Sequence, residues 1–293
     1  MRKVLRVVVV FVGLLWAQSA QADPYRLLVE SDANATAGHE VFVATYATLD
    51  NFLNSVPAGG SFSQINISAG FGVGGLAFDG SYRLLVESDT NTTAGNELFL
   101  SSYASFADFL SSTPSSGSFS QVNVSAGFSS VGFTFDGSQY HLLVESDANA
   151  TAGHELFLAS YNSLTDFLSS TPAGGGFSQI NVSAGFSVGG FTFDDGGYRL
   201  LVETDANATG GHELFLASYG SLDAFRNSTI GTGSFSQVNV SAGFSAAAFL
   251  AEPTPLPPPP PPPPPTGVPE PSTLLMLGLG FAATGVQRLR QSR

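Results

Sequence analysis

The 293-residue chain has no cysteine and only one lysine, and charged residues make up 11% of it. Without cysteine, it has no disulfide framework, no thiolate metal site and no cysteine nucleophile. Ten basic residues stand against 23 acidic ones, which gives a formal net charge of −13. Binding to a phosphate backbone requires a basic surface that displaces counterions, so nucleic acid is not expected as a partner.

Apolar residues are plentiful by comparison. They make up 43% of the chain, which includes 25 phenylalanines. A chain of this composition buries a hydrophobic core and is not disordered as a whole. Its stability must therefore come from packing.

The N-terminus has the pattern of a secretory signal peptide, with basic residues, an apolar stretch and small residues before a cleavage site. The apolar stretch runs from Val7 to Trp16, and the small residues are Ala20 and Ala22. This stretch is too short for a membrane anchor, because a helix needs about 20 apolar residues to span a bilayer. We expect signal peptidase to remove residues 1–22, so that the mature chain works outside the cytoplasm.

The C-terminus, residues 268–293, also has three parts: a proline-containing hexapeptide, an apolar stretch and a basic end. The hexapeptide is Val268, Pro269, Glu270, Pro271, Ser272 and Thr273, and the basic residues are Arg288, Arg290 and Arg293. Basic residues after an apolar segment keep that end in the cytoplasm and leave the preceding chain outside. In all three parts this tail resembles the PEP-CTERM sorting tail of Gram-negative bacteria.

The resemblance implies that a membrane-embedded exosortase recognises the tail and that the protein is transiently anchored in the inner membrane. It also implies a final place at the cell surface or in the extracellular matrix, since such proteins are associated with exopolysaccharide and biofilm formation. The apolar stretch is short for a transmembrane segment and contains three glycines. Cleavage and retention of the tail are therefore both open, and an ordinary single-pass anchor is the alternative interpretation.

A proline-rich spacer, residues 251–267, precedes the tail and contains nine consecutive prolines from Pro257 to Pro265. Such a run adopts polyproline II at about 3.1 Å per residue, which predicts a semi-rigid segment roughly 28 Å long. It would hold the folded body away from the membrane. A ligand for proline-binding modules is the alternative.

Residues 23–250 are predicted to form one β domain of four repeats, with the boundaries 25–81, 82–139, 140–197 and 198–250. In the third repeat, Tyr140–Glu145 and Leu156–Ala159 are apolar on both faces, as in fully buried strands. The segment Phe177–Val182 alternates, which favours an outer strand. One short helix is predicted at Ser163–Leu168 from its capping-box pattern.

The ends of the repeat array favour a closed ring. The first repeat lacks a preceding strand of the type GFTFDGS, and the last repeat ends with the counterpart of that strand, at Phe244–Phe249. Pairing this strand with the segment at Tyr25 would leave no open sheet edge. The predicted fold class is therefore all-β, a four-bladed β-propeller closed by the C-terminal strand, with an open β-solenoid or sandwich-like array as the alternative.

A polar pattern, D-x-N-x-T-x-G-x-E, occurs once in each repeat. Oxygen ligands at alternate positions of a glycine-containing loop suit Ca²⁺, but the same residue types also build hairpin turns through side-chain-to-backbone hydrogen bonds. Calcium is thus a candidate cofactor, and no other cofactor is expected. The candidate ligands are Asp32, Asn34, Thr36, Glu40, Asp89, Asn91, Thr93, Glu97, Asp147, Asn149, Thr151, Glu155, Asp205, Asn207, Thr209 and Glu213.

A catalytic site is not expected from the sequence. The G-x-S-x-G match around Ser187 falls in a generic glycine- and serine-rich segment, without the helix that a nucleophile elbow requires. The acidic residues also repeat uniformly. We therefore expect a non-catalytic surface or matrix protein that binds exopolysaccharide or another extracellular partner, with an extracellular polysaccharide hydrolase or lyase and a ligand-free coat protein as alternatives.

Overall fold

The computed structural model describes residues 24–31, 40–60, 62–67, 71–88, 97–115, 119–123, 128–146, 155–181, 186–204, 213–228, 235–239 and 244–253. The chain divides into two compact units, residues 1–254 and 255–293, and all described residues belong to the first. Within the described part, no helix is long and apolar enough to cross a bilayer.

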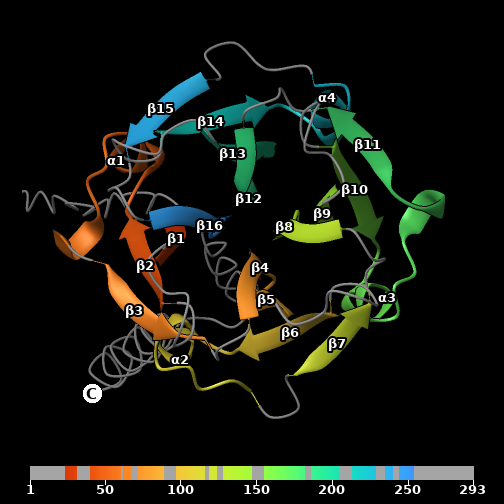
Figure 1. Ribbon diagram of the computed structural model, residues 1–293, viewed down its shortest axis with the longest axis horizontal. Coiled ribbons are helices and arrows are strands. Elements are labelled where there is room, and N and C mark those ends of the chain that lie inside the picture. The colour runs from red at the N-terminus through yellow and green to blue at the C-terminus, as the bar shows by residue number, and fades with distance from the viewer. Residues whose placement is uncertain are drawn as a thin grey trace, which may run out of the picture. The chain divides into compact units, whose positions relative to one another are not determined.

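The body consists of four antiparallel sheets of four strands each, arranged as blades around a central axis (Figure 1). The first blade contains β16 (Phe244–Ala251), β1 (Tyr25–Ser31), β2 (Glu40–Tyr46) and β3 (Ser63–Asn66). The second contains β4 (Phe71–Phe78), β5 (Tyr82–Ser88), β6 (Glu97–Tyr103) and β7 (Ser120–Asn123). The third contains β8 (Phe128–Phe135), β9 (Tyr140–Ser146), β10 (Glu155–Tyr161) and β11 (Ser178–Asn181). The fourth contains β12 (Phe186–Asp194), β13 (Gly197–Thr204), β14 (Glu213–Tyr219) and β15 (Phe235–Asn239).

The ring is closed by the C-terminal strand, as the repeat pattern predicts. β16 pairs antiparallel with β1, from Tyr25 opposite Ala251 to Ser31 opposite Phe244. The backbone N–H of Glu252 continues this pairing and donates to the carbonyl oxygen of Pro24 at 3.0 Å. The prediction of a four-bladed β-propeller closed by the C-terminal strand is thus confirmed. The alternative of an open β-solenoid or sandwich-like array is excluded. Each repeat gives its last strand to the next blade, so repeats and blades are offset by one strand.

A short helix follows the third strand of each blade: α1 (Leu49–Leu53), α2 (Phe106–Leu110), α3 (Leu164–Leu168) and α4 (Leu222–Arg226). Thr48 and Ser105 cap the first two helices by accepting a backbone N–H three residues on, and Ser163 and Ser221 do the same in the others. Two 3₁₀ turns, Ala58–Gly60 and Ala173–Gly175, lie before the outer strands β3 and β11.

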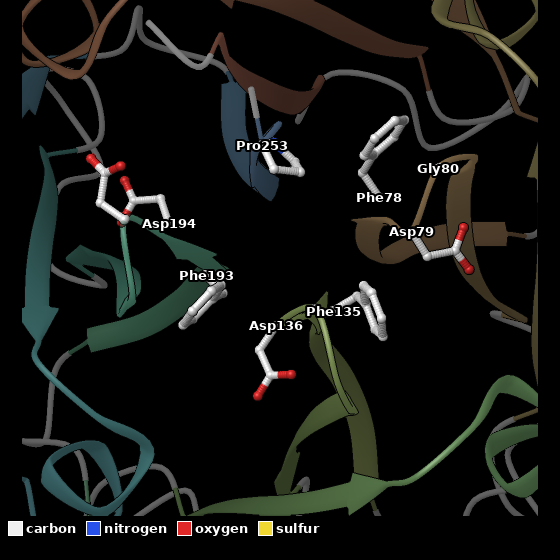
Figure 2. A pocket seen from close by; sticks show the side chains of 10 residues that line it. Phe78, Asp79, Gly80, Phe135, Asp136, Phe193, Asp194 and Pro253 are labelled. Carbon is white, nitrogen blue, oxygen red and sulfur yellow. The ribbon is translucent and has the colours of Figure 1, made fainter. Parts of the chain in front are cut away.

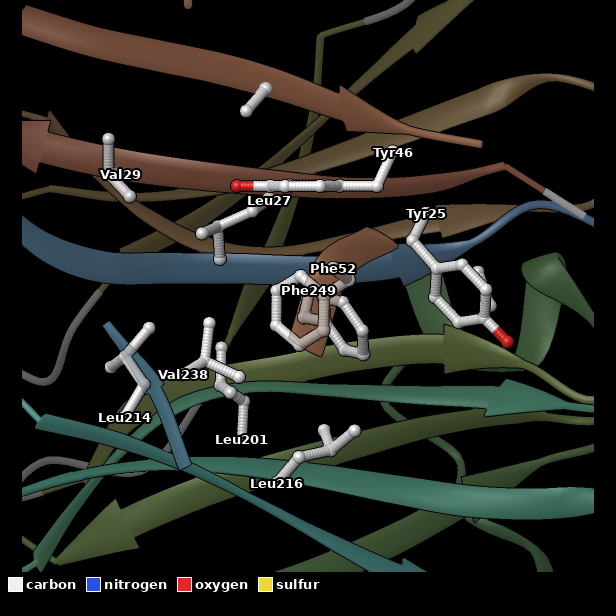
Figure 3. Close-up of a cluster of buried hydrophobic side chains, with 12 residues drawn as sticks. Tyr25, Leu27, Val29, Tyr46, Phe52, Leu201, Leu214, Leu216, Val238 and Phe249 are labelled. Atoms are coloured by element: carbon white, nitrogen blue, oxygen red, sulfur yellow. The ribbon is translucent and has the colours of Figure 1, made fainter. Parts of the chain in front are cut away.

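The hydrophobic core lies between neighbouring blades. In the cluster shown in Figure 3, Leu27 and Phe249 of the first blade pack with Leu201 and Leu214 of the fourth. The ring of Phe249 also lies 4.6 Å from that of Phe52, the buried residue of α1. Each such side chain contributes about 1.5–3 kcal/mol when it leaves water. The blades are therefore joined by packing, as expected for a chain without disulfides.

The four inner strands β4, β8, β12 and β16 surround the axis (Figure 1). Three of them carry glycine where a β-bulge shifts the register: Gly75, Gly132 and Gly190. At Gly190, whose φ is +154°, an added Cβ would lie 2.5 Å from the backbone nitrogen of Phe249. Glycine at this bulge therefore lets neighbouring inner strands approach closely.

Candidate functional site: an aromatic pocket on the propeller axis

A pocket of about 190 Å³ opens at one end of the axis, where the turns between inner and second strands meet (Figure 2). Its wall includes the rings of Phe78, Phe135 and Phe193 together with Asp195 and Pro253. Figure 2 shows these rings around the opening, with the carboxylate groups of the neighbouring aspartates directed away from its centre. The interior of the pocket is thus mainly aromatic.

The three phenylalanines occupy one position of the repeat. Each is paired across its hairpin with the first tyrosine of the following strand: Phe78 with Tyr82, Phe135 with Tyr140, and Phe193 with Tyr198. In the first blade, the same position opposite Tyr25 is held by Ala251. The fourfold pattern is therefore broken at one blade, where a methyl group stands in place of a ring.

Each ring is held in place by its paired tyrosine. The centroids of Phe78 and Tyr82 are 5.0 Å apart, as are those of Phe193 and Tyr198, and those of Phe135 and Tyr140 are 4.7 Å apart. The phenylalanines are half-buried, whereas the tyrosines are buried. A rigid aromatic wall on strand ends is better suited to binding a ligand than side chains on a mobile loop.

Behind the rings, carboxylates connect adjacent blades. Tyr198 donates its hydroxyl to Asp136 of the preceding blade at 2.8 Å. Tyr140 donates to Asp79 in the same way, and Tyr25 to Asp194. Glu252 takes the equivalent place in the first blade and binds Arg26, which in turn donates to Tyr82 at 3.3 Å.

Each carboxylate also has a basic partner on its own blade. Arg83 donates to Asp79 at 3.0 Å, and Arg199 donates to Asp194 at 2.7 Å. In the third blade a histidine takes this place: Nε2 of His141 lies 2.9 Å from Asp136.

The surroundings shift the pKa values of these groups. Burial raises the pKa of Tyr198 well above its ordinary value, and the hydrogen bond to Asp136 adds to this shift. Hydrogen bonds from His141, Gln139 and Tyr198 outweigh burial and lower the pKa of Asp136. The carboxylate therefore stays ionised and the phenol neutral. Because these groups are already engaged with one another, they hold the blades together and do not offer a free acid and base.

A second surface lies at the outer edge of the blades. Phe62, Phe119 and Phe177 each stand directly before an outer strand and are 43%, 61% and 44% exposed. Each is followed by an exposed glutamine: Gln64, Gln121 and Gln179. We call this set the outer aromatic row. It recurs in three blades, whereas the axial pocket is lined by residues of all four.

Most of the predicted site residues lie outside the described part of the chain. This holds for the cleavage-site alanines, the whole sorting tail and every candidate calcium ligand except the four glutamates. Glu40, Glu97, Glu155 and Glu213 each begin the third strand of a blade, opposite an asparagine of the outer strand. Within the described residues no cluster of metal-binding side chains occurs, and a calcium site remains a prediction.

Ser187 lies in β12, opposite Glu203 of β13. A strand therefore follows it, and no helix does, as expected from the sequence. The axial residues, in contrast, were missed. The signal for them was present: the strand GFTFDGS ends in F-D in three copies, while the last copy reads Ala251-Glu252-Pro253.

Comparison with known protein families identifies a sorting motif in the tail. The model described as the PEP-CTERM protein-sorting motif matches residues 267–291. The predicted resemblance of the tail is thus confirmed, and the motif marks the chain as an exported protein that an exosortase processes. A comparison with curated protein sequences finds no match.

Among solved structures, the fold is similar to the native arabinanase Arb43A of Bacillus subtilis, with a TM-score of 0.36 and 15% identity over 69% of this chain and 70% of that one. It is also similar to the α-L-arabinofuranosidase PaAbf62A of Podospora anserina, in complex with cellotriose. The TM-score there is 0.32, with 12% identity over 76% of this chain and 69% of that one. At these identities the likeness concerns the architecture.

The comparison corrects one expectation. Both similar structures are enzymes by name, so the prediction that the chain is not an enzyme is contradicted. That prediction took the uniform repeats as evidence against catalysis. The structure shows why this reasoning fails: the ring is not uniform at its axis, because Ala251, Glu252 and Pro253 replace the residues found in the other three blades.

Proposed function

We propose that the protein is an exported cell-surface or matrix protein whose propeller attaches to an extracellular polysaccharide through the outer aromatic row. The observation that carries the proposal is the combination of a sorting motif at 267–291 with three exposed, equivalent phenylalanines on one rigid ring. Signal peptidase and the exosortase act on the chain during export, and a matrix polymer is its final partner.

The chemistry of the outer row supports a polymeric ligand. An exposed aromatic ring beside an amide side chain combines an apolar face with hydrogen-bonding groups, which suits the faces and hydroxyls of sugar units. Several weak contacts on one polymer raise the overall affinity by the effective concentration of the linked sites.

We propose that the tail directs the protein to the cell surface and that the spacer holds the propeller away from the membrane. If the exosortase reads the tail, cells that make the chain without residues 268–293 will misplace it. Fractionation of cells producing the two forms, followed by detection of the protein in the membrane, surface and medium fractions, tests this part. An identical distribution of both forms would contradict it.

Attachment is tested separately with the purified protein. We expect co-sedimentation with exopolysaccharide from the producing cells, and a loss of at least ten-fold in affinity when Phe62, Phe119 and Phe177 are all replaced by alanine. A matched control replaces Val56, which is 55% exposed but does not precede an outer strand. Unchanged binding by the triple variant would refute the proposed surface. Release of sugar fragments during the assay would instead support the hydrolase or lyase alternative.

A further inference from the structure

We propose that the axial pocket binds an organic cation, an alkylammonium group held between the rings of Phe78, Phe135 and Phe193. This inference concerns a different surface from the outer aromatic row and does not depend on it. The rings belong to three different blades and meet around one opening (Figure 2). Such a set of aromatic faces attracts a cation through the ring quadrupoles.

The size of the pocket fits this class of ligand. Its volume is about 190 Å³, and in the first blade Ala251 holds the repeat position where the other blades place a phenylalanine. A cavity of roughly 150 Å³ accommodates a benzene molecule. The pocket is therefore large enough for a quaternary ammonium headgroup and too small for a long oligomer.

The charge around the pocket favours a cation. Five carboxylates stand on its wall or directly behind it: Asp79, Asp136, Asp194, Asp195 and Glu252. They outnumber the four nearby guanidinium groups, which belong to Arg26, Arg83, Arg199 and Arg226. Asp195 lies exposed at the rim, where the second and third blades have a glycine. This small excess of negative charge around an aromatic interior disfavours anions and favours cations at the opening.

The same wall is poorly suited to a neutral sugar. A buried sugar unit needs several hydrogen-bonding partners, because its hydroxyl groups lose water on binding. Among the lining residues, Asp79, Asp136 and Asp194 are already bound to a tyrosine and a basic side chain. The remaining wall is phenylalanine, glycine and proline, apart from Asp195. An alkylammonium group, which needs no directional acceptor, is therefore the better match.

The test uses choline as the probe and 3,3-dimethylbutan-1-ol as its neutral isostere, with the purified full-length chain and titration calorimetry. We expect choline to bind at least ten-fold more tightly than the isostere, since only the charge differs. Equal binding of the two would reduce the site to an apolar cavity and overturn the proposal. Absence of choline binding would overturn it as well.

Two substitutions connect the binding to the pocket. Phe135→Leu removes one ring while keeping apolar volume, and we expect at least a ten-fold loss of choline affinity. Asp195→Asn keeps a residue type that tolerates the positive φ of this position, 44°, and should weaken choline binding about three-fold. The control is Val56→Ala, at an exposed residue that does not line the pocket, and it should leave choline binding unchanged. An equal loss in the control would place the cation elsewhere and refute the assignment.

Discussion

Arg226 reaches Ser160 of the neighbouring blade, with Nη2 lying 3.4 Å from the hydroxyl oxygen. In each of the other blades, an arginine of the same blade donates a hydrogen bond to the corresponding hydroxyl. For example, Arg83 donates to Ser102 at 2.5 Å. The third blade has His141 at that arginine position, and its Nδ1 lies 2.9 Å from the same Ser160 oxygen. Arg226 stands where the other helices end in leucine. Two differences between the repeats thus compensate each other across one blade interface.

This relationship predicts a non-additive pair of substitutions. Arg226→Leu removes the guanidinium that serves Ser160, and His141→Arg places a second guanidinium beside Arg226. Each single change should lower the free energy of unfolding by about 1–2 kcal/mol, and the double variant should recover most of the loss because it restores the pattern of the other blades. Urea unfolding of the unchanged protein, the two single variants and the double variant measures the coupling energy between the two positions. Strictly additive effects would contradict compensation.

The buried His141 also predicts how stability depends on pH. Burial lowers the pKa of its imidazole, an effect that outweighs the attraction of Asp136, and Arg226 adds to it. Below pH about 6.5 the unfolded chain binds a proton at this residue that the folded chain does not, so stability falls as pH falls. We expect unfolding free energies that decrease from pH 7.5 to 5.5.

The control for this prediction is the His141→Arg, Arg226→Leu double variant, which has no titrating group at that place. Its stability should change less over the same interval. The other three histidines, His39, His154 and His212, are present in both proteins, so their contribution is expected to cancel in the comparison. A parallel loss of stability in the two proteins would show that His141 is not the group responsible.

The sequence predicted the ring because the missing strand at one end and the surplus strand at the other are visible in the repeat pattern. Phe244 to Ala251 then pairs with Tyr25 to Ser31, as the unpaired edge required. The axial pocket was not predictable in this way. Its phenylalanines are distant in sequence, and only the closure of four blades brings them together. Ala251 can be recognised as the residue that replaces a phenylalanine only when its pairing with Tyr25 is known.

Closure of the ring makes the hydroxyl of Tyr25 important for stability. This tyrosine donates to Asp194 of the fourth blade, a carboxylate with side-chain exposure of 1%. Tyr25→Phe removes one hydrogen-bond donor from this buried carboxylate. It should lower the free energy of unfolding by about 2 kcal/mol. The matched control is Tyr46→Phe, because Tyr46 is equally buried and its hydroxyl bonds to no described residue. Equal losses in urea unfolding for both variants would contradict a specific role of the Tyr25 hydrogen bond.

Close approach of the inner strands predicts that the bulge glycines tolerate no side chain. Gly190→Ala places a Cβ within 2.5 Å of the nitrogen and 2.8 Å of the Cβ of Phe249, at a φ that alanine disfavours. Because the nearest atom belongs to the backbone of the closing strand, the clash must push β16 away from β12. We expect a loss of more than about 1 kcal/mol in unfolding free energy, measured by urea denaturation. Gly220→Ala is the control, since a Cβ there meets nothing within 4 Å, and it should be neutral or slightly stabilising. A stable Gly190→Ala variant would mean that the inner strands are farther apart than the ring closure requires.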